Sequence, residues 1–223
     1  MEPRYIRNLN ALTETECNVL RSKKVAVIGC GGLGGYLIEM LARLGVGAIV
    51  AVDGDVFEET NLNRQILSSP AELGKSKAEA AVSRVRTINP DVEVTCVVTF
   101  LNAENAIGLL GGCDVVLDGL DNIGSRKVLA DACSQMGIPY VFGAIQGWVA
   151  QAALSMPGDG LIQRLYPDGI EVLDHSVLSF APALCASMQV ALCTKVLVGQ
   201  PVESGKLWYM DLYPMEFEGI PMV

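Results

Sequence analysis

The sequence predicts a doubly wound α/β fold, with a mainly parallel sheet, helices on both faces and an antiparallel C-terminal part. Short apolar, β-branched runs alternate with segments of helical spacing, which is the pattern of a parallel sheet built from βαβ units. Hydrophobic residues make up 51% of the 223 residues and charged residues only 18%, so we expect a large core. The length suits one sizeable domain.

The first βαβ unit has the clearest pattern. Residues 24–29 (KVAVIG) form a short apolar run that is typical of a buried parallel strand. After a glycine-rich turn, residues 36–45 place leucines and methionine at helical spacing, and a second apolar run follows at 48–53. Together they have the size of a Rossmann-like mononucleotide-binding half, about 30 residues.

The alternation continues to residue 147, after which the pattern changes. Residues 149–157 alternate like an exposed or antiparallel strand, and residues 157–175, with their Pro, Gly and Asp, are expected to form a loop. The other expected helices span 75–88, 103–110, 124–136 and 183–199, and the other expected strands span 92–98, 115–120, 139–144 and, as the last one, 207–213.

Composition excludes several classes of protein. A net charge of −9 argues against nucleic-acid binding, which needs a basic face. No apolar run reaches 18 residues uninterrupted and the N-terminus lacks an apolar leader segment, so we expect neither a membrane span nor a signal peptide. Seven scattered cysteines do not suggest a disulfide framework, which favours the reducing cytoplasm.

The turn after the first strand, G-C-G-G-L-G-G, contains Gly29-x-Gly31-x-x-Gly34. Glycines let the backbone approach a ligand here, and the N-terminus of the following helix favours anionic oxygens. Asp53 ends the next strand, where a carboxylate can accept hydrogen bonds from ribose hydroxyls. The turn predicts nucleotide binding without separating ATP from NAD or FAD.

The residues after Asp53 favour ATP. Residues 53–65 form a polar loop at the sheet edge where ligands bind, and its Arg64 is suited to pair with a phosphate. Asn61 and Asn63 offer amide donors, and Lys77 or Lys75 adds positive charge at a helix N-terminus. We interpret Lys75, Glu58 and Glu59 as solvated charges.

A carboxylate pair follows another predicted parallel strand, in D-G-L-D-N (118–122). Asp118 and Asp121 carry the hard oxygen ligands that Mg²⁺ prefers beside substrate phosphates. Positive groups and carboxylates on one sheet edge suit a metal-bound triphosphate, whereas a nicotinamide enzyme would more usually need an apolar slot and a proton donor.

Taken together, these motifs resemble the MoeB/ThiF/HesA group of ubiquitin-activating-enzyme-like adenylyltransferases. The resemblance covers nearly the whole chain, in the group's order and approximate spacing. Its blocks are R-Y-I-R (4–7), G-C-G-G-L-G-G, V-D-G-D, N-L-N-R-Q, G-K-S-K, I-N-P, L-D-G-L-D-N and G-K-L-W-Y-M-D-L (205–212).

The resemblance implies ATP-dependent adenylation of the C-terminal glycine of a small ubiquitin-like sulfur-carrier protein that ends in Gly-Gly. It implies catalytic roles for Arg7, Arg64, Lys77 and Asp121, with Asp121 holding Mg²⁺ and Asp53 the ribose. Arg7 would reach from one subunit into the other's site, so a homodimer is expected. The implied nucleotide-binding set is Gly29, Gly31, Gly32, Gly34, Asp53, Asp55, Asn61, Asn63, Arg64, Lys77, Asp121 and Asn122.

On this basis residues 1–223 are expected to form one adenylation domain. Its expected parts are an N-terminal arm and helix (1–22), a nucleotide-binding half (23–146) and a partner-binding and dimer part (147–223). Tryptophan 148 lies in the last part; we expect it in the core, although a strand edge there could pair with the carrier's tail.

The chain departs from the group in its cysteines. It has no C-x-x-C pair, so we expect no structural zinc. The region 170–180 lacks the cysteine that many relatives carry, and Cys185 and Cys193 lie in an apolar helix, where we expect them buried. We therefore expect the reaction to stop at the acyl-adenylate. His175, the only histidine, receives no role.

Three alternatives remain open at this point. The same fold could adenylate a tRNA-modification carboxylate or a peptide terminus. A Rossmann oxidoreductase would use NAD or FAD instead. A non-catalytic scaffold would bind a partner without turnover.

Overall fold

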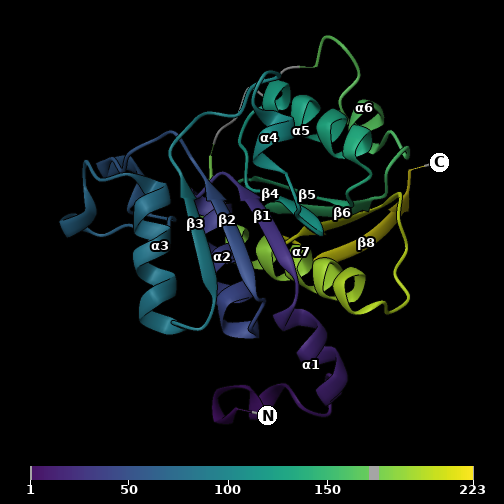
Figure 1. Ribbon diagram of the computed structural model, residues 1–223. Coiled ribbons are helices and arrows are strands. Elements are labelled where there is room, and N and C mark those ends of the chain that lie inside the picture. Colours follow the sequence, from purple (N-terminus) through teal and green to yellow (C-terminus); the bar gives the residue numbers. More distant parts are fainter. Residues whose placement is uncertain (1, 171–175, 223) are drawn as a thin grey trace.

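In the part of the chain that the computed structural model describes, residues 2–170 and 176–222, eight strands form one mixed sheet. The strand order is β3-β2-β1-β4-β5-β6-β7-β8 (Figure 1). The first five strands of this order, from β3 through β2, β1 and β4 to β5, are parallel to one another. From β5 onward each strand pairs antiparallel with the next, which confirms the predicted fold class. The strands are β1 (Lys24–Ile28), β2 (Ala48–Val52), β3 (Glu93–Val97), β4 (Val115–Asp118), β5 (Tyr140–Gln146), β6 (Val149–Ser155), β7 (Lys206–Asp211) and β8 (Glu216–Pro221).

Helices cover both faces of this sheet (Figure 1). Helices α2, α3 and α7 contribute to the hydrophobic cluster on one face, and α4, α5 and α6 to the cluster on the other. The α-helices are α1 (Glu14–Arg21), α2 (Gly32–Leu44), α3 (Lys77–Ile88), α4 (Ala106–Leu109), α5 (Ile123–Met136), α6 (Leu161–Leu165) and α7 (Phe180–Val198), and short 3-10 helices span Pro3–Asn8, Glu59–Asn61 and Pro70–Glu72.

The two clusters follow from the alternation of side chains along each strand. On the central strand β1, Val25 and Val27 belong to the α2 side, while Ala26 and Ile28 belong to the α5 side. Successive residues of a strand point to opposite faces, so a run that is apolar throughout is buried on both. This is why the segment 24–29 contains almost no polar residue.

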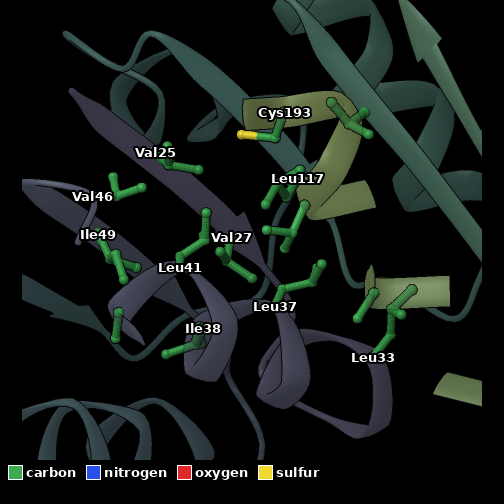
Figure 2. Close-up of a cluster of buried hydrophobic side chains, with 14 of the residues drawn as sticks. Val25, Val27, Leu33, Leu37, Ile38, Leu41, Val46, Ile49, Leu117 and Cys193 are labelled. Atoms are coloured by element: carbon green, nitrogen blue, oxygen red, sulfur yellow. The ribbon is translucent and has the colours of Figure 1, made fainter. Parts of the chain in front are cut away.

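The larger cluster is packed between α2, α7 and the sheet (Figure 2). Leu37 and Leu41 are one turn apart on α2 and fully buried, and they face the valines of β1. Cys193 of α7 joins the same cluster with no exposed surface, and Cys185 is equally buried, which confirms both as core cysteines. Each fully buried leucine of this kind stabilises the fold by roughly 1.5–3 kcal/mol.

Helix α7 is long and apolar enough to cross a membrane by length and composition. Its contacts are those of a core helix, because half of the relevant window is buried inside the molecule. Its Gln189 is fully buried and donates hydrogen bonds to the carbonyl oxygens of Asp118 (2.9 Å) and Val141 (3.0 Å). These bonds tie α7 to two neighbouring strands beneath the pocket described below.

Two expectations about the C-terminal third were wrong. The segment expected as a loop at 157–175 contains the short helix α6, whose Leu161 and Ile162 are buried; residues 171–175, with His175, lie outside the described part. The strand expected to be last is followed by β8, which pairs antiparallel with β7. Every residue of β8 is exposed, so it lacked the apolar run by which the other strands were found.

A buried carboxylate links α2 to α3. Glu39 is only 7% exposed and accepts hydrogen bonds from Arg84 Nε (2.7 Å) and Nη2 (2.9 Å) and from Arg43 Nε (2.7 Å). Burial alone would raise the pKa of Glu39, but the hydrogen bonds from the two arginines outweigh it, so its pKa is lowered from 4.5. The ionised form is therefore the one that stabilises the native state.

We expect Glu39→Gln to lower the free energy of unfolding at pH 7 by about 1–2 kcal/mol, a value reduced by the solvent around both arginines. Because the folded pKa of Glu39 is depressed, its ion pairs contribute fully to wild-type stability above pH 4.5. That contribution is lost as pH falls through the folded pKa. The difference between the two proteins should therefore shrink at pH 3. Urea unfolding at both pH values measures this, with the exposed Glu104→Gln as control; a difference independent of pH would contradict the pairing.

Candidate nucleotide-binding site

The carboxyl ends of the parallel strands surround a cavity of about 510 Å³. Doubly wound folds bind ligands at this edge, and sites for small molecules typically measure about 300–1,000 Å³. The segments that follow β1, β2, β3 and β4 supply most of its wall. Of the predicted set, the cavity is lined by Gly29, Gly31, Gly32, Asp53, Asp55, Arg64, Lys77, Asp121 and Asn122.

The glycine turn brings a helix terminus to the cavity wall. Gly31 is the N-cap of α2, and the helix begins at Gly32, four residues before the expected start at 36. The unpaired N–H groups of its first turn favour an anionic ligand. Gly34 lies below this wall: a Cβ there would be 1.7 Å from the carbonyl oxygen of Gly29. It therefore allows close packing and does not line the site, which corrects its predicted role.

Asp53 is held rigidly at the end of β2. Its Oδ2 accepts a hydrogen bond from the N–H of Cys30 (2.7 Å), and its Oδ1 accepts one from the N–H of Asp55 (2.8 Å). Burial raises the pKa of Asp53, and these two backbone hydrogen bonds oppose that rise. The carboxylate is fixed beside the glycine turn, with remaining lone pairs able to accept from a ligand hydroxyl.

Two cationic side chains reach the same cavity from different elements. Arg64 lies beside the turn, since a Cβ on Gly32 would be 3.5 Å from its Cγ. Lys77, the first residue of α3, is 7% exposed, and its Nζ lies 3.0 Å from Asp55 Oδ2. The cavity thus combines a helix N-terminus with two positive charges, a combination that suits phosphate groups.

The two asparagines of the polar loop have a different role from the one predicted. Asn61 is buried and its Oδ1 accepts a hydrogen bond from the N–H of Glu58 (3.0 Å). Asn63 donates to the carbonyl oxygen of Val177 (3.3 Å) and accepts from Arg64 Nη1 (2.9 Å). Neither lines the cavity; they order the loop that carries Arg64.

The two aspartates after β4 also differ. Asp121 is exposed and lines the cavity. Asp118 is fully buried below it, where it accepts hydrogen bonds from the N–H of Leu120 (2.8 Å) and the Tyr140 hydroxyl. Asp118 therefore does not offer oxygens to a metal in the cavity, which corrects the expectation of a carboxylate pair. Burial raises the pKa of Asp118, against the opposing charge of Arg126.

Arg126 is a cavity residue that the sequence motifs did not indicate. It lines the cavity yet is only 6% exposed, and its Nε lies 3.5 Å from Asp118 Oδ2. Its other nitrogens donate to the carbonyl oxygen of Leu120 (2.5 Å) and to the Tyr166 hydroxyl (3.0 Å). Through its contacts with Leu120 and Asp118, Arg126 anchors the loop that presents the carboxylate of Asp121.

Gln65 and Phe100 also line the cavity without having been singled out. Gln65 is 6% exposed, and its Oε1 has no hydrogen-bond partner among the described residues. It directly follows Arg64 in N-L-N-R-Q, so its place in that block was the one available signal. Phe100 has no motif around it, and only the fold brings it to the site.

The remaining predicted residues lie elsewhere. Arg7 is exposed on the first 3-10 helix and does not line the cavity of its own chain. Lys75 is exposed and pairs with Glu72 at 3.3 Å, as expected for a solvated charge. Trp148 was wrongly expected in the core: it is 44% exposed and lies at the turn between β5 and β6.

The fold and the cavity define a nucleotide-binding α/β enzyme domain, and comparisons with known proteins agree. The sequence profile of the ThiF family matches residues 5–222. The chain is 37% identical over 210 residues to the SAMP-activating enzyme E1 of Haloferax volcanii, which covers 91% of this chain and 77% of that protein. It is 40% identical over 213 residues to the probable adenylyltransferase/sulfurtransferase MoeZ of Mycobacterium tuberculosis, which covers 90% of this chain and 54% of that protein.

Among solved structures, E. coli MccB with ATP matches with a TM-score of 0.83 at 22% identity, over the whole of this chain and 72% of that one; this likeness concerns the fold. The chain belongs to the ThiF family. The matched domain is an ATP-dependent adenylyltransferase of the ubiquitin-activating-enzyme-like type.

Proposed function

We propose that the chain adenylates the C-terminal glycine of a small ubiquitin-like sulfur-carrier protein. The observation that carries this proposal is the single cavity in which a helix N-terminus, Arg64, Lys77 and the exposed Asp121 meet. The names of the relatives, which describe SAMP activation and an adenylyltransferase/sulfurtransferase, support the choice of acceptor.

The reaction depends on positive charge and on the positioning of the substrates more than on general acid or base catalysis. A carboxylate oxygen of the carrier forms a bond to the α-phosphorus of ATP, the bond to the bridging oxygen breaks, and pyrophosphate leaves. The attacking carboxylate is already ionised at pH 7, so no general base is required. Arg64, Lys77 and the N–H groups at the start of α2 stabilise negative charge on the phosphoryl oxygens.

Magnesium fits this site as a companion of the nucleotide. No cluster of three or more acidic, histidine or cysteine side chains suited to a metal occurs within residues 2–170 and 176–222. Mg²⁺ is usually bound through one or two carboxylates together with substrate phosphates, and Asp121 offers one exposed carboxylate in the cavity. Bound there, Mg²⁺ would neutralise charge on the phosphates.

We propose further that the active species is a homodimer. Arg7 is exposed and away from its own cavity, which leaves it available to enter the cavity of a second subunit. The first 3-10 helix is held to the body of the domain through the buried Tyr5, whose hydroxyl accepts from Asn89 Nδ2 (2.7 Å). Arg7 would therefore be presented from a fixed base.

The carrier's body is proposed to dock on the aromatic cluster of Trp148, Phe180 and Tyr213. The rings of Phe180 and Tyr213 lie 5.1 and 5.6 Å from that of Trp148, centroid to centroid. All three are exposed, by 42%, 78% and 44% for Phe180, Tyr213 and Trp148. Trp148 adjoins Val149 of the cavity wall, so a carrier bound here could reach the nucleotide with its tail.

The test is exchange of labelled pyrophosphate into ATP, with a ubiquitin-fold protein ending in Gly-Gly as acceptor. We expect exchange that requires the carrier, and a carrier–AMP adduct in the mass spectrum; a carrier lacking its last glycine should support neither. Trp148→Ala should raise the carrier's KM roughly 10- to 30-fold, because exposed aromatic anchors carry much of the binding energy of an interface. Ile107→Ala, an exposed apolar change on α4, is the matched control. Exchange that ignores the carrier would refute the proposed acceptor.

A further inference from the structure

The segment after β3 brings an aromatic ring to the cavity rim. Phe100 lines the cavity and is nevertheless 66% exposed. Single exposed apolar side chains are common on protein surfaces, so exposure alone does not indicate a binding role. The position of this ring relative to Asp53 and Gly54 is more specific.

One face of the Phe100 ring is covered by backbone. A Cβ added to Gly54 would lie 2.7, 2.7 and 2.9 Å from three consecutive ring carbons. Distances this similar place that point over the face of the ring, because an in-plane approach to one carbon leaves its neighbours clearly farther away. Gly54 is therefore the residue that lets the ring lie flat against the loop, while the side chain as a whole stays 66% exposed and lines the cavity.

The order of the strands fixes where a nucleotide's parts can lie. Along the sheet edge, neighbouring strands follow the order β4, β1, β2, β3. The groups after their carboxyl ends are, in the same order, Asp121, the glycine turn, Asp53 and Phe100. Neighbouring strands are about 4.8 Å apart. With phosphates at the turn beside Arg64 and ribose at Asp53, as the proposed function requires, the next position outward belongs to the base. There the cavity wall is formed by Val52, Leu101 and Phe100, none of which carries a charge.

We propose that Phe100 is the platform on which the nucleobase of ATP stacks. An aromatic face accepts a base without desolvating polar groups, and such stacking contributes about 1–3 kcal/mol per base when tested by alanine substitution. This corresponds to an affinity loss of about 5- to 150-fold, at 1.4 kcal/mol per factor of ten. The contact also fixes the base end of the nucleotide, and thereby the direction in which its phosphates cross the glycine turn.

Two ligands distinguish the contribution of the base to binding from that of the phosphates. Isothermal titration calorimetry with ATP and with inorganic tripolyphosphate, both with Mg²⁺, measures the dissociation constants for wild type and Phe100→Ala. We expect the variant to bind ATP about 5- to 150-fold more weakly and tripolyphosphate as well as wild type does. Phe217→Ala, which removes another exposed ring from β8 outside the cavity, is the matched control and should leave both unchanged.

A second variant tests the geometry. Gly54→Ala would drive a methyl group into the ring of Phe100, so we expect it to weaken ATP binding by itself and to add little in the Phe100→Ala background. Unchanged ATP affinity in Phe100→Ala, or an equal loss for tripolyphosphate, overturns the platform while leaving the proposed function in place. A wild-type protein that binds neither ligand overturns both.

Discussion

Arg64→Ala and Asp121→Ala should each slow carrier-dependent exchange of pyrophosphate into ATP by about 10² to 10³, the usual effect of removing one preorganised group that stabilises transition-state charge. Arg64 is positioned before any ligand arrives, because its Nη1 donates to the carbonyl oxygen of Thr60 and to Asn63 Oδ1, both at 2.9 Å. Asp121 is the exposed carboxylate of the cavity. Steady-state exchange rates at saturating ATP, carrier and Mg²⁺ measure both effects.

Lys75→Ala provides the control for charge alone. Lys75 lies two residues before Lys77 but is exposed and outside the cavity, so its removal should leave the rate within about twofold, as for a solvated charge. Near-wild-type exchange in both Arg64→Ala and Asp121→Ala would show that the cavity is not the adenylation site.

The same variants report on the proposed dimer. If Arg7 of one subunit completes the site of the other, Arg7→Ala and Arg64→Ala homodimers should both be slow. Mixing the two variants then creates one intact site per heterodimer, in which both arginines are present. Exchange should recover to a measurable fraction of wild type on mixing, and no recovery despite subunit exchange would contradict a shared site.

Arg126→Met should lower the free energy of unfolding by about 3–5 kcal/mol, the usual cost of breaking a buried ion pair from one side. The variant leaves Asp118 fully buried with the Leu120 N–H and the Tyr140 hydroxyl as its partners. Burial raises the pKa of Asp118 even in the wild type, and loss of the guanidinium should raise it further. Urea denaturation without nucleotide measures the change.

The pH dependence of this loss of stability shows whether the buried charge of Asp118 causes it. A carboxyl whose folded pKa lies above its unfolded value binds more protons when folded, so stability falls as pH rises from the unfolded pKa through the folded one. The penalty of Arg126→Met should therefore grow with pH between the folded pKa of Asp118 in the wild type and its higher folded pKa in the variant, by up to about 1.4 kcal/mol per pH unit. Asp118→Asn in the same chain should remove this dependence.

Lys127→Met is the matched control on the same helix. Lys127 pairs with the fully exposed Asp168 at 2.8 Å, so its loss should change the free energy of unfolding very little, because solvent screens the pair. A penalty for Arg126→Met that is equally small, or independent of pH, would mean that Asp118 is not charged in the native protein.

Much of the fold could be predicted because its signals are local. β1, β2 and β4 are buried on both faces, so their apolar runs mark them to within two residues. Where the signal was not local, prediction failed. Glycines are poor helix formers, so the start of α2 was placed too late, and β8 is fully exposed, so no apolar run announced it.

The site could be predicted in part for the same reason. Residues that follow parallel strands share one edge, which placed Asp53 and Asp121 correctly beside the glycine turn. Polarity within a motif did not reveal what each side chain contacts: Asn61 bonds to its own loop, and Asp118 points into the core. Arg126 and Phe100 reach the cavity only through helix and strand packing, which spacing along the chain does not encode.

The cavity wall draws on segments from Ile28 to Val177, and its floor joins β1 to β4 across about ninety residues of sequence. Contacts between such distant segments form late, after loop closure has been overcome. During synthesis, a growing chain therefore lacks part of the cavity wall until Val177 has emerged from the ribosome. We expect fragments that end before β4 to bind ATP more weakly than the whole chain, because they lack Asp121 and the floor of the cavity.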